Sequence, residues 1–324
     1  MSVGPIRFVV FGDATLDVTV HGSAPSGHGS DRPARITLGP GGQGANMAVR
    51  LARRGARVTL VTALADDVAG EQLAGFLAAD EVIVVALAAD RTGTVVSLVD
   101  ATGERAMLSD RASLDAAGLR SPSVRSATDE AGWIHVSGYP LADAASGAAL
   151  AAMLSSRRAE QGCSVGGGSF VASREMQDRL LTRLRTIRPE LVLFDRAEAS
   201  VLLGREPAAR RASAESPSAE SPSAEGLAAE LASALGGTAV VTDGAAGAAA
   251  ATPAGSVMVP GLPGAALDAT GAGDAFGAGF LLALAGGPWP PLLPAVRDAL
   301  ERGSGLGAEV AGVVGAQARL PSEA

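Results

Sequence analysis

The chain has 324 residues, which is enough for one large α/β domain or two smaller ones with a substantial core. Its basic residues are all arginines, 26 against 34 acidic residues, so the net charge is −8 and no clustered basic stripe of a nucleic-acid-binding protein is present. Because lysine is absent, a phosphate site has to use backbone amides, helix ends, a metal ion or arginine, and not the lysine of a P-loop.

Three features of the sequence predict a cytoplasmic protein without a membrane partner. Cys163 is the single cysteine, which excludes an intrachain disulfide and a cysteine metal cluster. The first apolar run, residues 6–11, is soon followed by Asp13, as expected for a buried strand and not for a signal peptide. The longest apolar candidate for a membrane span, residues 275–285, is far shorter than the roughly 20 residues that a bilayer requires.

Short apolar runs alternate with helical patterns along most of the chain. Strands are predicted at 6–11, 58–64, 133–138, 191–195 and 238–244, and helices at 45–54, 69–79, 142–159, 227–235 and 275–285. This alternation is typical of a mostly parallel sheet with helices on both faces, in which ligands bind at the carboxyl ends of the strands.

Three segments interrupt the alternation. Residues 14–40 and 92–108 have short strand patterns, the second with a turn at 101–103, and both are predicted to belong to a small β-lid. Residues 205–226 contain a tandem SPSAE repeat that is rich in Ser and Pro and cannot form a core, so we expect a low-complexity surface insertion there.

Two glycine-rich stretches each precede a predicted helix. The first, GPGGQGAN at residues 39–46, taken alone favours a tight connection between a strand and a helix, with Asn46 in the first helical turn. The second, DATGAGD at 268–274, predicts a helix N-terminus with free amides, which is a favourable place for an anion. An acid at Asp274 would repel that anion, unless the carboxylate takes part in chemistry beside it.

Five segments, in order, resemble those of one family. GGQGAN at 41–46 and DATGAGDAF at 268–276 resemble the signature stretches of the ribokinase-like (PfkB) carbohydrate kinases, and VVFGDATLD at 9–17, ALADDVAG at 63–70 and VVTDGAAGA at 240–248 resemble further family segments. The resemblance implies a three-layer α/β/α sandwich with a mostly parallel central sheet and a small β-lid. It implies one kinase domain over residues 1–316, a C-terminal tail at 317–324, and the lid as a candidate surface for a homodimer.

The resemblance also implies ATP-dependent phosphorylation of a hydroxyl group of a sugar or sugar-like molecule. Asp274 would be the general base, and the amides of Gly271, Ala272 and Gly273 would bind the charge on the transferred phosphoryl group. The substrate would be bound by Asp17, Gly42 and Asn46, and the nucleotide by Thr242, Gly244 and Gly247.

Metal sites are implied at two places. Glu198 and Asp195 would serve Mg²⁺, and Asp268 with Thr270 would hold a monovalent cation, K⁺, together with groups near Val310, Val313 and Gly315. The chain departs from the family pattern in two respects. Asp195 stands where an Asn is usual, and Gly166 with Gly167 supply no side chain where relatives carry an acid or Asn followed by Pro.

Several alternatives remain open on the sequence. The departures allow a catalytically silent relative that binds a sugar or nucleotide and regulates a partner. Ribose, a ketohexose, a 2-keto-3-deoxy sugar acid and a nucleoside are all candidate substrates, although aromatic residues make up 3% of the chain and disfavour a stacked nucleobase pocket. Solvated or capping roles are expected for His21, His28 and His135, and solvated side chains for Arg105 and Arg111. Trp133 is expected to be a core residue.

Overall fold

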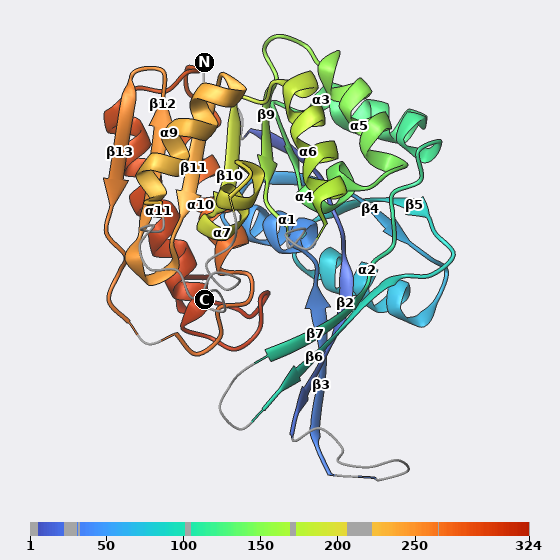
Figure 1. The fold of residues 1–324 in the computed structure, drawn as a ribbon. Helices are drawn as coiled ribbons and strands as arrows, with labels where there is room; N and C mark the ends of the chain where they lie inside the picture. The colour runs from blue at the N-terminus through green and yellow to red at the C-terminus, as the bar shows by residue number, and fades with distance from the viewer. Residues whose placement is uncertain are drawn as a thin grey trace.

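The computed structural model describes residues 6–22, 31, 33–100, 105–168, 173–205, 222–264 and 266–323. These residues form a large sheet covered by helices on both faces, from which a second, smaller sheet projects (Figure 1). No helix in this part of the chain is both long and apolar enough to cross a membrane.

The large sheet runs in the order β13-β12-β11-β10-β9-β8-β1-β4-β5. Neighbouring strands from β11 to β5 are parallel, and β12 and β13 are antiparallel to their neighbours at one edge. The strands are β1 (Arg7–Phe11), β4 (Arg57–Leu64), β5 (Ile83–Ala88), β8 (Trp133–Val136), β9 (Gly162–Gly166), β10 (Leu191–Asp195), β11 (Thr238–Thr242), β12 (Ala248–Thr252) and β13 (Gly255–Val259).

Alternate residues of the parallel strands point to opposite faces and enter two separate cores. In β1, Phe8 and Val10 belong to one core, and Val9 and Phe11 to the other. The first core is covered by α1 (Gln43–Arg53), α2 (Val68–Ala79), α10 (Ala272–Leu284) and α11 (Leu293–Ala311). The second is covered by α3 (Pro122–Glu130), α4 (Gly138–Ala142), α5 (Ser146–Ser155), α6 (Arg174–Ile187), α7 (Arg196–Leu202) and α9 (Ala224–Leu235).

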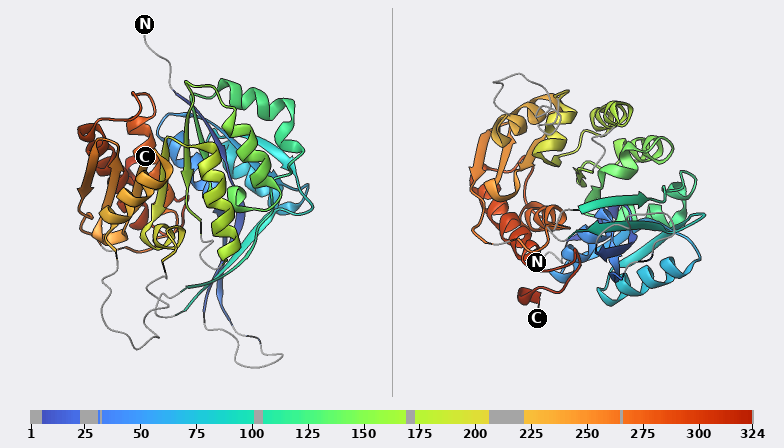
Figure 2. Two further views of the ribbon diagram at one scale, coloured as in Figure 1. Left: turned by 45° about the horizontal axis from the view of Figure 1, so that its top comes forward. Right: turned by 60° about the horizontal axis from the view of Figure 1, so that its bottom comes forward.

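Within the first core, the N-terminal and C-terminal parts of the chain meet. Helix α10 packs against both α11 and α1, although more than two hundred residues separate α1 from α10 (Figure 2). Three short 3₁₀ helices complete the described structure, η1 (Gly118–Arg120), η2 (Gly244–Ala246) and η3 (Pro321–Glu323).

The small sheet is the expected lid, in the order β3-β2-β6-β7, and it extends away from the body toward the bottom of the view in Figure 1. Its strands are β2 (Thr15–His21), β3 (Arg35–Gly41), β6 (Gly93–Val99) and β7 (Arg105–Asp110). Their register places apolar residues on one face, and the exposed members are Ile36, Leu38, Leu98 and Leu108. Asp17, Thr19 and Ser97 lie on the opposite face.

The predicted α/β sandwich and β-lid are confirmed, but some boundaries differ. The helix expected at 142–159 is α5, which spans Ser146–Ser155 only. It begins after the short helix α4 has ended at Ala142, where the Asp143 carboxylate accepts hydrogen bonds from the amides of Ala145 (3.0 Å) and Ser146 (2.9 Å). The helix expected from residue 275 begins at Ala272. This earlier start places Asp274 in the first turn of α10.

The ends of two other predicted segments also differ. The expected insertion at 205–226 lies mostly outside the described residues, but 224–226 form the first turn of α9, where the Ser223 hydroxyl accepts a hydrogen bond from Gly226 N (3.1 Å). Residues 317–323 are packed onto the body and are not a free tail, since Gln317 and Leu320 are buried. The predicted turn at 101–103 is outside the described residues.

Candidate functional site

The predicted site residues gather at the carboxyl ends of the parallel strands. Asp195 ends β10 and Thr242 ends β11, and helices α1 and α10, with Asn46 and Asp274 in their first turns, begin beside them. At the start of α1, Gly42 has φ of 94°, which L side chains rarely adopt, and a Cβ there would lie 2.6 Å from the Asp13 carbonyl oxygen. This glycine therefore brings the α1 N-terminus against the end of β1.

The turn before α10 also depends on a glycine. Gly271 caps the helix with φ of 77°, and a Cβ at this position would lie 2.7 Å from the Cβ of Ala316. The N–H of Ala272 donates to the carbonyl of Ala269 at 3.2 Å, so this one of the three proposed anion-binding amides has an acceptor within the turn. Gly273 is exposed, and the space around its Cβ position is open.

Asp274 is held by two amide side chains of α1. Its Oδ2 accepts a hydrogen bond from Asn46 Nδ2 at 2.8 Å, and Gln43 donates a second side-chain hydrogen bond to the carboxylate. Burial, together with the nearby charges of Asp13 and Glu198, raises the pKa of Asp274 to about 7, while the two amide donors oppose this rise. Such a carboxyl can exchange a proton near neutral pH.

Two cavities meet beside Asp274. One of about 130 Å³ is lined by Asp274, Glu198 and His135, and the other, of about 290 Å³, is largely apolar. Thr242, Gly244 and Gly247, the predicted nucleotide-binding residues, all line the larger of these two cavities. Thr242, Gly273 and Phe276 line both, so a ligand in the apolar cavity could reach the α10 N-terminus beside the carboxylate.

Asp17 lies where the lid joins the body, on the lid face that carries polar residues. Its Oδ1 accepts a hydrogen bond from the Thr15 hydroxyl at 2.7 Å. Burial raises the pKa of Asp17, whereas the Thr15 hydrogen bond and the charge of Arg111 act in the opposite direction. A half-buried carboxylate at the mouth of a lid is suited to accept hydrogen bonds from substrate hydroxyls.

The sequence reasoning missed the pair formed by Asp13 and Arg111. Arg111 follows β7 directly and donates to the buried Asp13 carboxylate, and its guanidinium stacks 4.1 Å from the ring centroid of Tyr139. Arg111 is therefore anchored between the lid and the body and is not a freely solvated arginine. The position of Arg111, directly after the predicted lid strand, is the feature of the sequence that could have indicated a role at the site.

Glu198 and Asp195 form a capping box at the start of α7. Glu198 accepts from Gly168 N (2.7 Å) and Asp195 N (2.9 Å), and Asp195 accepts from Glu198 N (2.7 Å). Burial, followed by the charge of Asp195, raises the pKa of Glu198 to about 7. The side chain occupies the space next to Gly167, where an added Cβ would lie 1.9 Å from Glu198 Oε2.

This pair is compatible with Mg²⁺. No group of three or more His, Cys, Asp or Glu side chains gathers as a metal site within the described ranges. Mg²⁺ in phosphate-transferring sites is usually bound by one or two carboxylates, with water and substrate phosphates completing the coordination. Two adjacent carboxylates, one of them with a raised pKa, meet that requirement, because a cation would stabilise their ionised forms.

The proposed monovalent-cation residues lie at one junction. Asp268 is buried, and its carboxylate accepts hydrogen bonds from Thr270 N (2.8 Å) and Gly315 N (2.9 Å), which ties loop 268–270 to the turn after α11. The carbonyl of Val310 accepts from the N–H of Val313 (3.1 Å) at the end of α11. The predicted residues are thus brought together beside the turn that precedes α10.

The histidine expectations are only partly met. His135 is buried and not solvated: its Nδ1 lies 2.9 Å from the Ser164 hydroxyl, and burial lowers its pKa to about 3. Trp133 Nε1 donates to the same hydroxyl at 2.9 Å, so Trp133 is a core residue as predicted. His21 is exposed at the end of β2, whereas His28 and the side chain of Arg105 lie outside the described part of the chain.

Comparisons with known proteins agree with this architecture. The profile of the pfkB family carbohydrate kinases matches residues 6–323. A fructokinase from Klebsiella pneumoniae is 31% identical over 320 residues, which cover 96% of this chain and 95% of that protein.

Solved structures show the same fold. A ribokinase from Giardia lamblia superimposes with a TM-score of 0.78 at 15% identity, covering 99% of this chain and 97% of that one. A fructokinase from Vibrio cholerae, a double mutant with bound fructose, ADP and potassium ion, has a TM-score of 0.74 at 24% identity, covering 99% and 97% of the two chains. The match of the family profile to nearly the whole chain, supported by the curated relative, shows that this protein belongs to the PfkB family of carbohydrate kinases.

Proposed function

We propose that this carbohydrate kinase transfers the γ-phosphoryl group of ATP to a hydroxyl of a sugar, with Asp274 as the general base. The observation that carries the proposal is the position of Asp274, in the first turn of α10, where the two cavities meet and where its pKa is raised to about 7. A carboxylate there can accept the hydroxyl proton close to the anion-binding end of the helix.

The proposed step requires little else from the protein. The Asp274 carboxylate takes the proton as the hydroxyl oxygen attacks the γ-phosphorus, the bond to the β,γ-bridging oxygen breaks, and ADP leaves. The amides of Gly271, Ala272 and Gly273 stabilise the charge on the transferred group, with the N–H of Ala272 turning from the Ala269 carbonyl to do so. Asp274 then releases its proton to solvent.

The sugar is proposed to bind between the lid and the body. Asp17 accepts hydrogen bonds from two of its hydroxyls, and Gly42 and Asn46 line the same pocket. The charge of Arg111 acts on the Asp17 carboxylate, and Arg111 pairs with Asp13, whose carboxylate accepts from Gly44 N (3.4 Å) at the start of α1; this proximity supports the assignment. Holding the sugar in one orientation aligns the accepting hydroxyl with the γ-phosphoryl group.

ATP is proposed to occupy the 290 Å³ cavity, with Thr242, Gly244 and Gly247 along its wall. Asp195 and Glu198 would hold Mg²⁺, which when bound neutralises phosphate charge. Asp268 and Thr270, with the turn at Val313 to Gly315, would hold K⁺ next to the Gly271 turn. A monovalent cation there would add positive potential near the phosphates without touching the sugar.

Fructose is the first substrate to test, because the curated relative is a fructokinase. The test is a panel of fructose, ribose, 2-keto-3-deoxygluconate and adenosine with Mg-ATP and K⁺, measuring ADP release and the phosphorylated product. Product with a sugar or sugar acid supports the proposal. Product with adenosine alone would identify the runner-up, a nucleoside kinase, and thermal stabilisation by a ligand without any product would identify the silent regulatory relative.

We further propose that the lid forms a homodimer. Its apolar face carries Ile36 and Leu38, which are about 60% exposed, and Leu108, which is 66% exposed. Exposed apolar side chains of this size that are contiguous across strands usually mark an interaction surface. Pairing with a second copy of the lid would bury this face and leave the opposite, Asp17-bearing face toward the sugar.

A further inference from the structure

Three consecutive residues near the C-terminus contact three different parts of the site. Gly315 N donates to Asp268 at 2.9 Å, and Ala316 packs where a side chain on Gly271 would have to lie. Gln317 Nε2 donates to Asn46 Oδ1 at 3.0 Å, and both side chains are buried. Residues 315–317 thus contact loop 268–270, the Gly271 turn before α10, and Asn46, which donates to Asp274.

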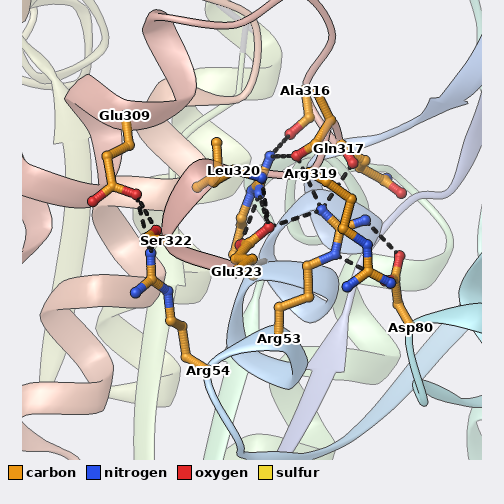
Figure 3. A network of polar contacts seen from close by, with 12 residues as sticks. Arg53, Arg54, Asp80, Glu309, Ala316, Gln317, Arg319, Leu320, Ser322 and Glu323 are labelled. Atoms are coloured by element: carbon orange, nitrogen blue, oxygen red, sulfur yellow. Dashed lines mark hydrogen bonds and ion pairs between the residues drawn. The ribbon is translucent and has the colours of Figure 1, made fainter.

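Helix α1 fixes this segment through two arginines. Arg50 and Arg53 lie four and seven residues after Asn46, so all three occupy one side of α1. Arg50 Nη1 pairs with Glu323 at 3.0 Å, and Arg53 Nη1 lies 3.3 Å from the same carboxylate. The side chains of Arg50 and Glu323 are 0% and 1% exposed. A buried, doubly paired carboxylate therefore ties the last described residues to α1 (Figure 3).

The same arginines hold the backbone on both sides of Gln317. Arg50 Nη2 donates to the carbonyls of Ala316 (2.7 Å) and Ala318 (3.0 Å), and Arg53 Nη1 donates to the carbonyl of Gln317 (2.9 Å). Three successive carbonyls are bound, so the place from which the Gln317 side chain projects is fixed. Its amide can then act on Asn46 with a defined geometry.

The Asn46 amide has two possible orientations, and its partners choose between them. An ionised Asp274 is only an acceptor, so it needs the NH₂ group of Asn46. In that orientation Asn46 Oδ1 points away from Asp274 and is buried, and a buried oxygen without a hydrogen-bond donor would destabilise the fold. Gln317 Nε2 supplies the donor that satisfies this oxygen.

We infer that Gln317 is a positioning residue of the kinase: it holds Asn46 so that its NH₂ group faces Asp274 and keeps that base ionised and correctly oriented. The inference rests on the proposed role of Asp274 as general base. Asn46 and Gln43 are the amide donors that face Asp274 from α1, while Asp13 after β1 and Glu198 of α7 face it with negative charge. Loss of the Gln317 donor would allow the Asn46 amide to rotate. The Asn46 hydrogen bond would then offset less of the rise in the pKa of Asp274 that Asp13 and Glu198 cause.

The direct test is the titration of Asp274 in full-length protein labelled with ¹³C at the aspartate carboxyl carbons, with Asp274→Asn used to assign the signal. Gln317→Met keeps the length of the side chain and removes the donor. We expect the pKa of Asp274 to rise by about one unit, because a hydrogen bond to a charged group is worth roughly that much or more. Gln317→Leu is the second variant if Met at this position impairs folding.

Arg319→Ala is the matched control, because Arg319 lies two residues further along and its 62%-exposed side chain pairs with Asp80. This control should leave the Asp274 titration unchanged. In an Asn46→Ala background, Gln317→Met should add no further shift, since the residue through which it acts is gone. An Asp274 titration that is the same in wild type and in both Gln317 variants would overturn the inference.

The activity test uses fructose and ATP over pH 5.5 to 9. In Gln317→Met, the acid limb of the kcat profile should move to higher pH by about one unit, and at pH values above that limb kcat should return to the wild-type value. A variant whose fold is merely loosened would instead have a lower kcat at every pH. Equal loss at every pH overturns the inference. If Asp274→Asn stays active, the proposed base is wrong whatever the titration shows, so the two failures are distinguishable.

Discussion

Asp274 joins two properties that are usually in conflict, a negative charge and a position partly withdrawn from solvent. The charge is tolerated because Asn46 and Gln43 donate to it and because it lies in the first turn of α10, where a carboxylate interacts favourably with the helix dipole. Burial and the charges of Asp13 and Glu198 outweigh these donors and bring the pKa to about 7. The environment thus gives the carboxyl a pKa suited to proton transfer.

Asp274→Asn should abolish most of the phosphoryl transfer. The amide keeps the size of the side chain but cannot accept the proton, so single-turnover rates should fall by about 10²- to 10⁴-fold. ATP affinity should hold or tighten, because a negative charge near the triphosphate is removed. Gly273→Val is the comparison: the space at its Cβ is open, so the fold should persist while the branched side chain weakens both ATP binding and turnover. Near-full activity of Asp274→Asn would refute the assignment.

The same substitution should stabilise the protein in a pH-dependent manner. Because the pKa of Asp274 is higher in the folded state than its ordinary value of 3.8, the folded protein binds this proton more tightly, and stability falls as pH rises from about 4 to 7. A rise in the pKa from 3.8 to about 7 corresponds to about 4 kcal/mol, and because Asp274 is only partly buried, we expect Asp274→Asn to gain about half of this, about 2 kcal/mol, at pH 8 and little at pH 4. Urea unfolding at both pH values measures this, and an equal gain at both would mean that ionisation of Asp274 is not the cause.

Asp17→Ala should separate the sugar site from the nucleotide site. If Asp17 accepts hydrogen bonds from two hydroxyls, KM for the sugar should rise by about 10-fold or more, while KM for ATP stays nearly constant. Turnover should also fall, because a sugar that is less well oriented reaches the reactive position less often. Steady-state kinetics with each substrate varied in turn provide the measurement. Equal increases in both KM values would indicate a structural role for Asp17.

At the scale of secondary structure, the sequence predicted the parallel strands β1, β4, β8, β10 and β11 and both lid segments, since alternating apolar runs and glycine turns depend on local chemistry. Strands β5 and β9 were not among the predicted elements. The division between α4 and α5 was missed because it depends on Asp143, whose capping role looks like an ordinary loop acid in the sequence. Gln317 and Arg111 were missed as site residues for another reason. Their partners, Asn46 and Asp13, are about 270 and 98 residues away, a distance that no local pattern spans.

The lid prediction is tested by charging its apolar face. Leu38 is 59% exposed on β3, and Leu38→Asp should convert the proposed homodimer to a monomer, because a carboxylate at a buried interface is strongly disfavoured. Val68→Asp is the control, since Val68 is 72% exposed at the start of α2 and is not part of the lid sheet. Light scattering coupled to gel filtration gives the masses. A wild-type monomer, or a Leu38→Asp dimer, would refute the lid interface.

At the scale of the whole molecule, the C-terminal residues close the structure against its N-terminal helix. Arg50 lies fully buried in α1, and its charge is met by Glu323 and by the carbonyls of Ala316 and Ala318. Without Glu323, the guanidinium of Arg50 would remain buried without the carboxylate that pairs with its charge. The segment that also reaches Asp268 and Asn46 therefore depends on this ion pair for its position.

Glu323→Gln tests the ion pair. Removing one partner of a buried pair typically costs about 3–5 kcal/mol, and because two carbonyls still bind Arg50, we expect about 3 kcal/mol and a fall of several degrees in Tm. The control is Arg302→Ala, which breaks an exposed pair with Asp298 (66% and 56% exposed) and should cost less than about 0.5 kcal/mol. Differential scanning calorimetry measures both. If the two variants have the same Tm, the C-terminal segment does not stabilise the fold through this pair. A lower Tm in Glu323→Gln alone, together with a lower kcat, would connect the position of this segment to the reaction at Asp274.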